Sequence, residues 1–161
     1  RDIPKFTHFF NANSELLNGL FTCLFELHSY PYKEYSSWLL VHMLRNKVID
    51  GTPYYEPFVD TLFKTDDQTV LRNVTNCLNE IELQEYRESE FIDRLIGFIN
   101  DASNKVALQM LSIYLLMKFC VKYPELIGEV REVIHLNAEG KTAAYKVGMR
   151  NFEKKFPSEG Y

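Results

Sequence analysis

Apolar residues recur three and four positions apart in one segment of the chain after another. This spacing is typical of amphipathic helices, whereas half-buried strands alternate with a period of two. The pattern predicts a helix in every ordered segment and no strand. The predicted helices cover about residues 14–28, 34–47, 54–64, 65–81, 89–99, 104–123, 124–134 and 143–156.

The segment 104–123, NKVALQMLSIYLLMKFCVKY, is apolar on nearly every side. Gln109, Ser112 and Lys118 interrupt it, so it is shorter than the roughly 18–20 apolar residues of a membrane span. A helix that is apolar all round is buried between other helices. We therefore expect this segment at the centre of the fold, with Leu111 and Leu115 among its buried residues.

Breaks between the helices follow from local chemistry. Pro31 disfavours helix in the residue before it, and Thr65 with Gln68 matches a capping box that opens the next helix. We expect an irregular lead-in over residues 1–12, one repeat domain over 13–156 and a tail over 157–161.

Composition narrows the class of protein. The 161 residues carry a net charge of −4, which gives no general attraction to nucleic acid or anionic lipid. The cysteines, Cys23, Cys77 and Cys120, lie far apart in apolar stretches, so we expect buried, reduced thiols. No charged segment followed by an apolar run opens the sequence, and we expect a cytoplasmic protein without a membrane segment.

The helices recur in pairs, about 32 to 37 residues apart, with Trp38, Val70, Val106 and Ala143 at like positions. The segment DDQTVLRNVTNCLNEI resembles a HEAT repeat, and residues 101–106 resemble the same entry turn one repeat later. The resemblance implies an all-α fold, a right-handed α-α superhelix of stacked antiparallel hairpins of the HEAT/armadillo type. The basic residue that usually follows the repeat's Val stands one place late, as Arg72 after Leu71.

The C-terminal part, with SIYLLMKF and TAAYKVGMRNFEKKF, is similar to small bacterial HEAT-like proteins. Some of those are named adenylosuccinate lyases, but this chain lacks the lyase loop of Ser, Met, Lys and Asn, so we expect no lyase activity. The resemblance implies a non-enzymatic protein-binding module, a scaffold or adaptor. HEAT-like DNA alkylation-repair glycosylases share the architecture and give an alternative, nucleic-acid-associated function. Their groove is basic and carries Trp and Asp, whereas this chain is acidic and has a single Trp.

No constellation of catalytic or metal-binding residues stands out. The histidines have no acidic partner at ligand spacing, and glycines are too sparse for a phosphate loop. The acidic run from Glu80 to Glu90 reads as a solvated linker. We expect no catalytic residues, no metal and no cofactor.

Two surfaces are candidates for binding a partner protein. Aromatic residues are favoured at interfaces. A patch of them lies around the predicted helix 34–47 and at the start of the predicted helix 54–64, and it comprises Tyr32, Tyr35, Trp38 and Tyr54. Second helices of stacked hairpins line one face, and their outward positions here are acidic, which favours a basic peptide or protein segment. This predicted acidic face comprises Glu56, Asp60, Glu90, Asp93, Glu125, Glu129 and Glu132.

Overall fold

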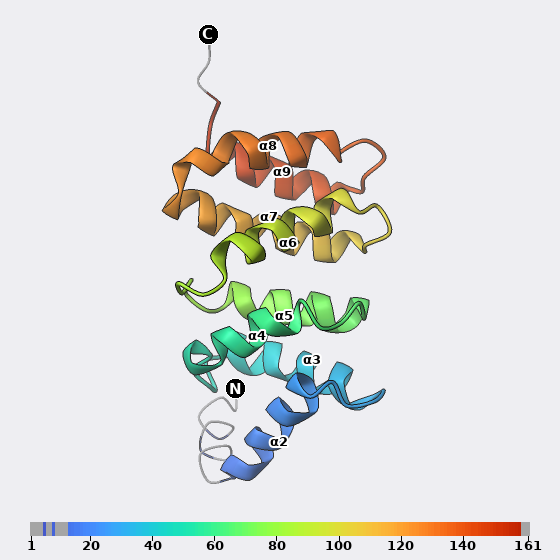
Figure 1. The fold of residues 1–161 in the computed structure, drawn as a ribbon, viewed down its shortest axis with the longest axis vertical. Helices are drawn as coiled ribbons and strands as arrows, with labels where there is room; N and C mark the ends of the chain where they lie inside the picture. The colour runs from blue at the N-terminus through green and yellow to red at the C-terminus, as the bar shows by residue number, and fades with distance from the viewer. Residues whose placement is uncertain (1–4, 6–7, 9–12, 159–161) are drawn as a thin grey trace. The chain divides into compact units, whose positions relative to one another are not determined.

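The computed structural model describes Lys5, His8 and residues 13–158. Residues 13–158 form eight α-helices, two short 3-10 turns and no strand. The helices are α2 (Ser14–Phe25), α3 (Tyr32–Arg45), α4 (Tyr55–Thr61), α5 (Gln68–Asn79), α6 (Glu88–Asn100), α7 (Val106–Lys122), α8 (Ile127–Leu136) and α9 (Ala143–Lys155), with turns η1 (Thr52–Tyr54) and η2 (Pro124–Leu126). The all-helical prediction is confirmed (Figure 1).

The chain divides into two compact units, residues 1–84 and residues 85–161. In the first unit α3 packs against both α2 and α5, and α4 packs on α5. Its core is formed by Phe21, Leu24, Leu40, Phe58 and Val74, all buried. The apolar stripes predicted for these helices therefore face one another, as amphipathic helices require.

The second unit is built from two neighbouring pairs, α6 with α7 and α8 with α9. Helices α7 and α9, which begin at the like repeat positions Val106 and Ala143, pack together. Helices α6 and α8, the other helices of these repeats, also pack together. The buried Tyr145 side chain donates a 2.7 Å hydrogen bond from its hydroxyl to the Ile134 carbonyl, which joins α9 to α8.

Helix α7 is the most deeply packed element of the second unit. Leu115 and Phe119 are fully buried, and so are the polar Gln109 and Ser112, which the apolar pattern alone reads as interruptions. Leu111, expected in the core, is only half-buried. A helix enclosed on most sides hides some polar side chains because the helical period, not polarity, decides which positions turn inward.

Two helix starts differ from prediction. Asp67, rather than Thr65, is the N-cap of α5, and its carboxylate accepts a 3.0 Å hydrogen bond from the Val70 backbone N–H. Helix α6 begins at Glu88, one residue before the predicted start at 89, and follows Arg87 in a left-handed conformation. Asp is at least as good an N-cap as Thr, which explains the first difference.

The expected lead-in over residues 1–12 lies outside the described residues apart from Lys5 and His8, which are helical. The sequence also predicts a right-handed superhelix and one continuous domain over residues 13–156. Both predictions depend on how the two units are joined. Both stay predictions.

Candidate protein-binding surface

Helix α3 presents a strip of exposed aromatic side chains. Tyr32, Tyr35 and Trp38 are 60%, 65% and 51% exposed, and we call these three residues the aromatic strip. Their spacing of three places them on neighbouring turns of one helix face. Of the eight exposed large hydrophobic residues in the described chain, five lie between Leu16 and Trp38, so exposed apolar surface is concentrated here.

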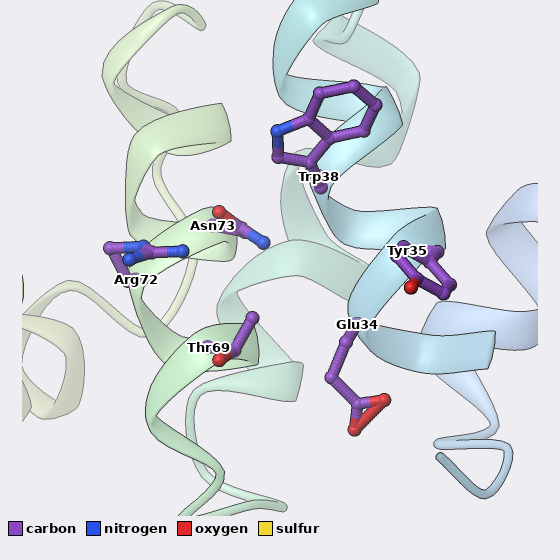
Figure 2. Close-up of a pocket in the computed structure, with 6 residues that line it drawn as sticks. All are labelled: Glu34, Tyr35, Trp38, Thr69, Arg72 and Asn73. Atoms are coloured by element: carbon purple, nitrogen blue, oxygen red, sulfur yellow. The ribbon is translucent and has the colours of Figure 1, made fainter. Parts of the chain in front are cut away.

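The aromatic strip lies between two surface pockets of the first unit. The pocket between α2 and α3 has a volume of about 410 Å³, and Tyr32, Tyr35, Leu16 and Cys23 help to line it. The pocket between α3 and α5 has a volume of about 250 Å³ (Figure 2). It is lined by Glu34, Tyr35, Trp38, Thr69, Arg72 and Asn73. Tyr35 therefore borders both hollows.

Buried polar side chains form the floor of the α3–α5 pocket. Asn73 of α5 donates a 3.0 Å hydrogen bond from Nδ2 to the Ser37 hydroxyl, and that hydroxyl donates a 2.8 Å bond to the Glu34 carbonyl. Asn73 is 4% exposed, and its Oδ1 accepts no hydrogen bond from the residues the structure describes. This arrangement ties α5 to α3 and leaves an acceptor at the pocket.

Charged groups at the α3–α5 pocket differ in whether they have partners. The buried Glu34 carboxylate lies 2.9 Å from the Lys33 ammonium, although neither carboxylate oxygen accepts a hydrogen bond from the described residues. Arg72 is exposed and forms no ion pair or hydrogen bond with any described residue. The Lys33 ammonium is therefore shared between two carboxylates, Glu34 at 2.9 Å and Asp67 at 3.9 Å, whereas Arg72 has no anionic partner among the described residues.

Sequence reasoning missed Glu34, Asn73 and Arg72 as members of a site. The signal available was the displaced basic residue of the repeat: Leu71 takes the buried position, and Arg72 turns to the surface beside α3. The fourth aromatic candidate, Tyr54, is not part of the strip. Its ring stacks on Phe21 at a centroid distance of 3.8 Å, within the packing of α2 against η1.

The seven acidic candidates lie on the helices for which they were predicted. Glu56 and Asp60 lie on α4 of the first unit, Glu90 and Asp93 on α6, and Glu125 to Glu132 on η2 and α8 of the second unit. Asp60 is half-buried and the others are exposed. Glu90 forms a 2.7 Å ion pair with Arg87, which removes it from the set of unpaired carboxylates.

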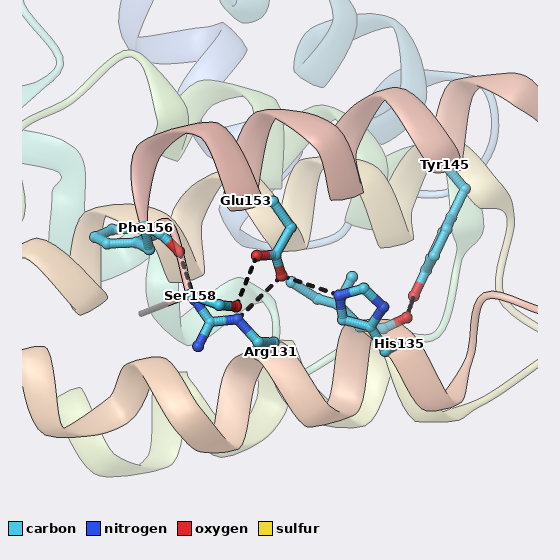
Figure 3. A network of polar contacts seen from close by, with 7 residues as sticks. Arg131, His135, Tyr145, Glu153, Phe156 and Ser158 are labelled. Carbon is cyan, nitrogen blue, oxygen red and sulfur yellow. Dashed lines mark hydrogen bonds and ion pairs between the residues drawn. The ribbon is translucent and has the colours of Figure 1, made fainter. Parts of the chain in front are cut away.

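Arg131, which neighbours Glu132 in α8, pairs with α9 instead of with the acidic face (Figure 3). Its guanidinium pairs with Glu153 of α9 at 3.0 Å and donates to the Phe156 carbonyl, and His135 also contacts Glu153 at 2.9 Å. Burial alone would raise the pKa of Glu153, but the hydrogen bonds from His135 and Arg131 and their charges lower it below its usual value. Asp93, Glu125, Glu129 and Glu132 form no ion pair with the described residues.

The acidic run between the units is more ordered than a solvated linker. Glu88 accepts hydrogen bonds from Lys122 at 2.8 Å and from the Tyr123 hydroxyl at 2.7 Å, and Glu80 lies 3.7 Å from Arg45. Burial opposes ionisation of Glu88, but these bonds outweigh it and lower its pKa. The solvated-linker prediction is therefore wrong for Glu88, which is half-buried in α6, whereas Glu80 is exposed.

Chemistry elsewhere in the described chain is sparse. Cys77 and Cys120 are buried free thiols, and burial raises the pKa of Cys120 to about 11, while Cys23 is half-buried. Among the described residues no group of three or more His, Cys, Asp or Glu is arranged to hold a metal ion. None of the helices in that part of the chain combines the length and apolar character needed to cross a membrane.

The sequence pattern of the HEAT repeat domain family matches residues 1–156. The chain therefore belongs to the HEAT repeat domain family, a class of helical-repeat interaction modules. No curated protein and no solved structure matches it. The recognition made from the paired helices and the acidic entry turn is confirmed.

Proposed function

We propose that this protein is a non-enzymatic binding module that recognises another protein through the aromatic strip of α3. The observation that carries the proposal is the exposure of Tyr32, Tyr35 and Trp38 on one helix, flanked by two pockets. Aromatic side chains that keep large apolar surfaces in water are typical of interface anchors, because their burial releases that surface from hydration. Membership in the HEAT family supports this assignment.

The acidic face is a second proposed contact surface, and it would take a basic peptide or protein segment. Its support is the set of carboxylates on η2, α6 and α8 that form no ion pair with the described residues: Asp93, Glu125, Glu129 and Glu132. Charge complementarity of this kind speeds association and selects partners more than it adds affinity.

The test of the aromatic strip is capture of partners from the native host, followed by mass spectrometry. We expect a stoichiometric protein partner that is captured by the wild type and lost with a Tyr35→Ala, Trp38→Ala double variant. Truncating interface anchors costs about 2 kcal/mol or more each. Both side chains are more than half exposed, so the variant should keep its melting temperature.

The control removes exposed apolar side chains from the second unit with a Leu136→Ala, Val147→Ala double variant. Leu136 is 73% exposed and Val147 is also exposed, so general stickiness should fall equally in both variants. A partner lost equally with both variants, or retained by the α3 variant, would contradict the proposal.

A further inference from the structure

We infer that the α3–α5 pocket binds an acidic peptide segment, in which a carboxylate side chain pairs with Arg72 and an apolar neighbour packs on Trp38 and Tyr35. The inference rests on the proposed function and names the chemistry of the partner at that surface. It concerns a pocket of the first unit alone.

The charges at the pocket select an anion over a cation. Lys33 already lies beside the Glu34 carboxylate, at 2.9 Å, so an incoming cation would compete with a bound ammonium. Arg72 has no anion or acceptor among the described residues, and a guanidinium binds carboxylates through parallel, charge-assisted hydrogen bonds. A ligand carboxylate would therefore satisfy a group that the chain itself leaves unsatisfied.

Nearby groups favour a peptide over a free anion. Trp38 and Tyr35 supply an apolar wall on α3 opposite Thr69, Arg72 and Asn73 on α5 (Figure 2). Asn73 is only 4% exposed, and its Oδ1 has no hydrogen-bond donor among the described residues. This oxygen could therefore accept a hydrogen bond from a peptide N–H. The Asn73 orientation follows from its Nδ2 bond to Ser37, which fixes the oxygen as the free atom.

Net charge does not oppose this recognition at close range. The chain carries −4 overall, but exposed charges farther than about 8 Å are screened at physiological ionic strength. Along the same two helices the other exposed guanidinium, Arg45, is held by Asn76 at 2.9 Å and lies near Glu80. Arg72 is thus the cation of this face that is available to a ligand.

The experiment uses Trp38 as its own reporter, because it is the single Trp of the 161-residue sequence. Short synthetic peptides of Glu, Leu and Ser, free of aromatic residues, are titrated into the full chain while Trp38 emission is followed. Matched peptides replace every Glu with Gln or with Lys. We expect a saturable change in Trp38 emission with the Glu peptide, a lower affinity with the Gln peptide, and no change in Trp38 emission with the Lys peptide.

Variants assign the binding to the guanidinium. Arg72→Gln should weaken binding of the Glu peptide about tenfold, since it removes a charge-assisted pair. Arg72→Lys should retain part of the affinity, because it keeps the charge and loses the planar fork. Arg150→Gln, which removes an exposed cation from α9 of the second unit, should leave the affinity unchanged. Circular dichroism and melting curves check that each variant is folded.

Equal binding of the Glu and Gln peptides, preference for the Lys peptide, or an unchanged affinity of Arg72→Gln would overturn the inference. So would the absence of any emission change with the Glu peptide at millimolar concentration. The proposed function fails separately: a natural partner lost with the Tyr35→Ala, Trp38→Ala variant would uphold binding at the strip even if the acidic chemistry is wrong.

Discussion

At the scale of single residues, the buried amide of Gln109 shows how a polar side chain can hold an apolar helix in place. Gln109 is fully buried in α7, and its Nε2 lies 3.1 to 3.3 Å from the carbonyls of Phe98, Ile99 and Asp101. These carbonyls lie at the C-terminal end of α6, where the helix has no partners of its own for them. The Oε1 accepts a 2.7 Å hydrogen bond from Lys141.

We predict that Gln109→Leu lowers the free energy of unfolding by about 1–3 kcal/mol, because the α6 carbonyls and the Lys141 ammonium lose a buried partner. Gln84→Leu is the matched control, since Gln84 donates one 2.8 Å hydrogen bond to the Thr52 carbonyl in an exposed setting. It should cost less than about 1 kcal/mol. Urea unfolding of both variants measures the difference, and equal costs would contradict the role given to Gln109.

This residue also marks a limit of sequence reasoning. Hydrophobic periodicity locates α7 correctly, but it treats Gln109 and Ser112 as breaks in an apolar surface. Their burial depends on carbonyls supplied by the end of α6 and, for Ser112, on the Leu108 carbonyl one turn earlier. A contact between residues about ten positions apart has no periodic signature, so the sequence alone does not reveal it.

At the scale of elements, the packing of α7 decides the stability of the second unit. We predict that Leu115→Ala or Phe119→Ala costs about 2–5 kcal/mol, the range for large-to-small changes in cores. Leu111→Ala should cost less, because Leu111 is only half-buried. Lys154→Ala, at an exposed position of α9, should change the free energy of unfolding by less than about 0.5 kcal/mol. Thermal unfolding ranks the four variants, and an equal loss at Leu115 and Lys154 would refute the placement of α7.

The contact between α8 and α9 depends on pH through Glu153 (Figure 3). Its pKa is lowered in the folded protein, so the unfolded chain binds more protons over the same pH range. The contribution to stability is present above the usual carboxyl pKa and is lost as pH falls through the folded value. We predict that Glu153→Gln loses less stability than the wild type between about pH 5 and pH 3.

The control for this pH dependence is Glu132→Gln, which neutralises an exposed carboxylate of α8 with no ion pair to the described residues. Its stability should follow the wild-type pH profile. Parallel profiles for wild type and Glu153→Gln, measured by thermal unfolding in buffers of matched ionic strength, would show that the cluster with Arg131 and His135 contributes nothing over this range.

At the scale of the whole molecule, the sequence predicts architecture better than it predicts the site. Helical spacing and the paired repeat were enough for the all-α HEAT class, because both follow from local periodicity. Of the four aromatic residues that the sequence singled out, Tyr32, Tyr35 and Trp38 are exposed on one helix. Tyr54 instead stacks its ring on Phe21. Which exposed Arg lacks a partner depends on where every carboxylate finally lies, and that is decided by tertiary packing.

The acidic face leads to the last prediction, which separates protein binding from the nucleic-acid alternative. The chain has a net charge of −4 and carries exposed carboxylates on α4, α6, η2 and α8, and these carboxylates would repel a phosphate backbone.

The test of the acidic face is direct binding at low salt. We expect a Lys/Arg-rich peptide to bind the wild type, and we expect duplex DNA not to bind. A Glu125→Lys, Glu129→Lys double variant should weaken peptide binding about tenfold, because it replaces two exposed negative charges with positive ones. A Glu82→Lys, Glu139→Lys variant makes the same +4 change in net charge at exposed residues outside the acidic face, and it should weaken peptide binding much less. Tight, salt-sensitive binding of DNA by the wild type would overturn the acidic-face proposal and favour a function related to the repair glycosylases.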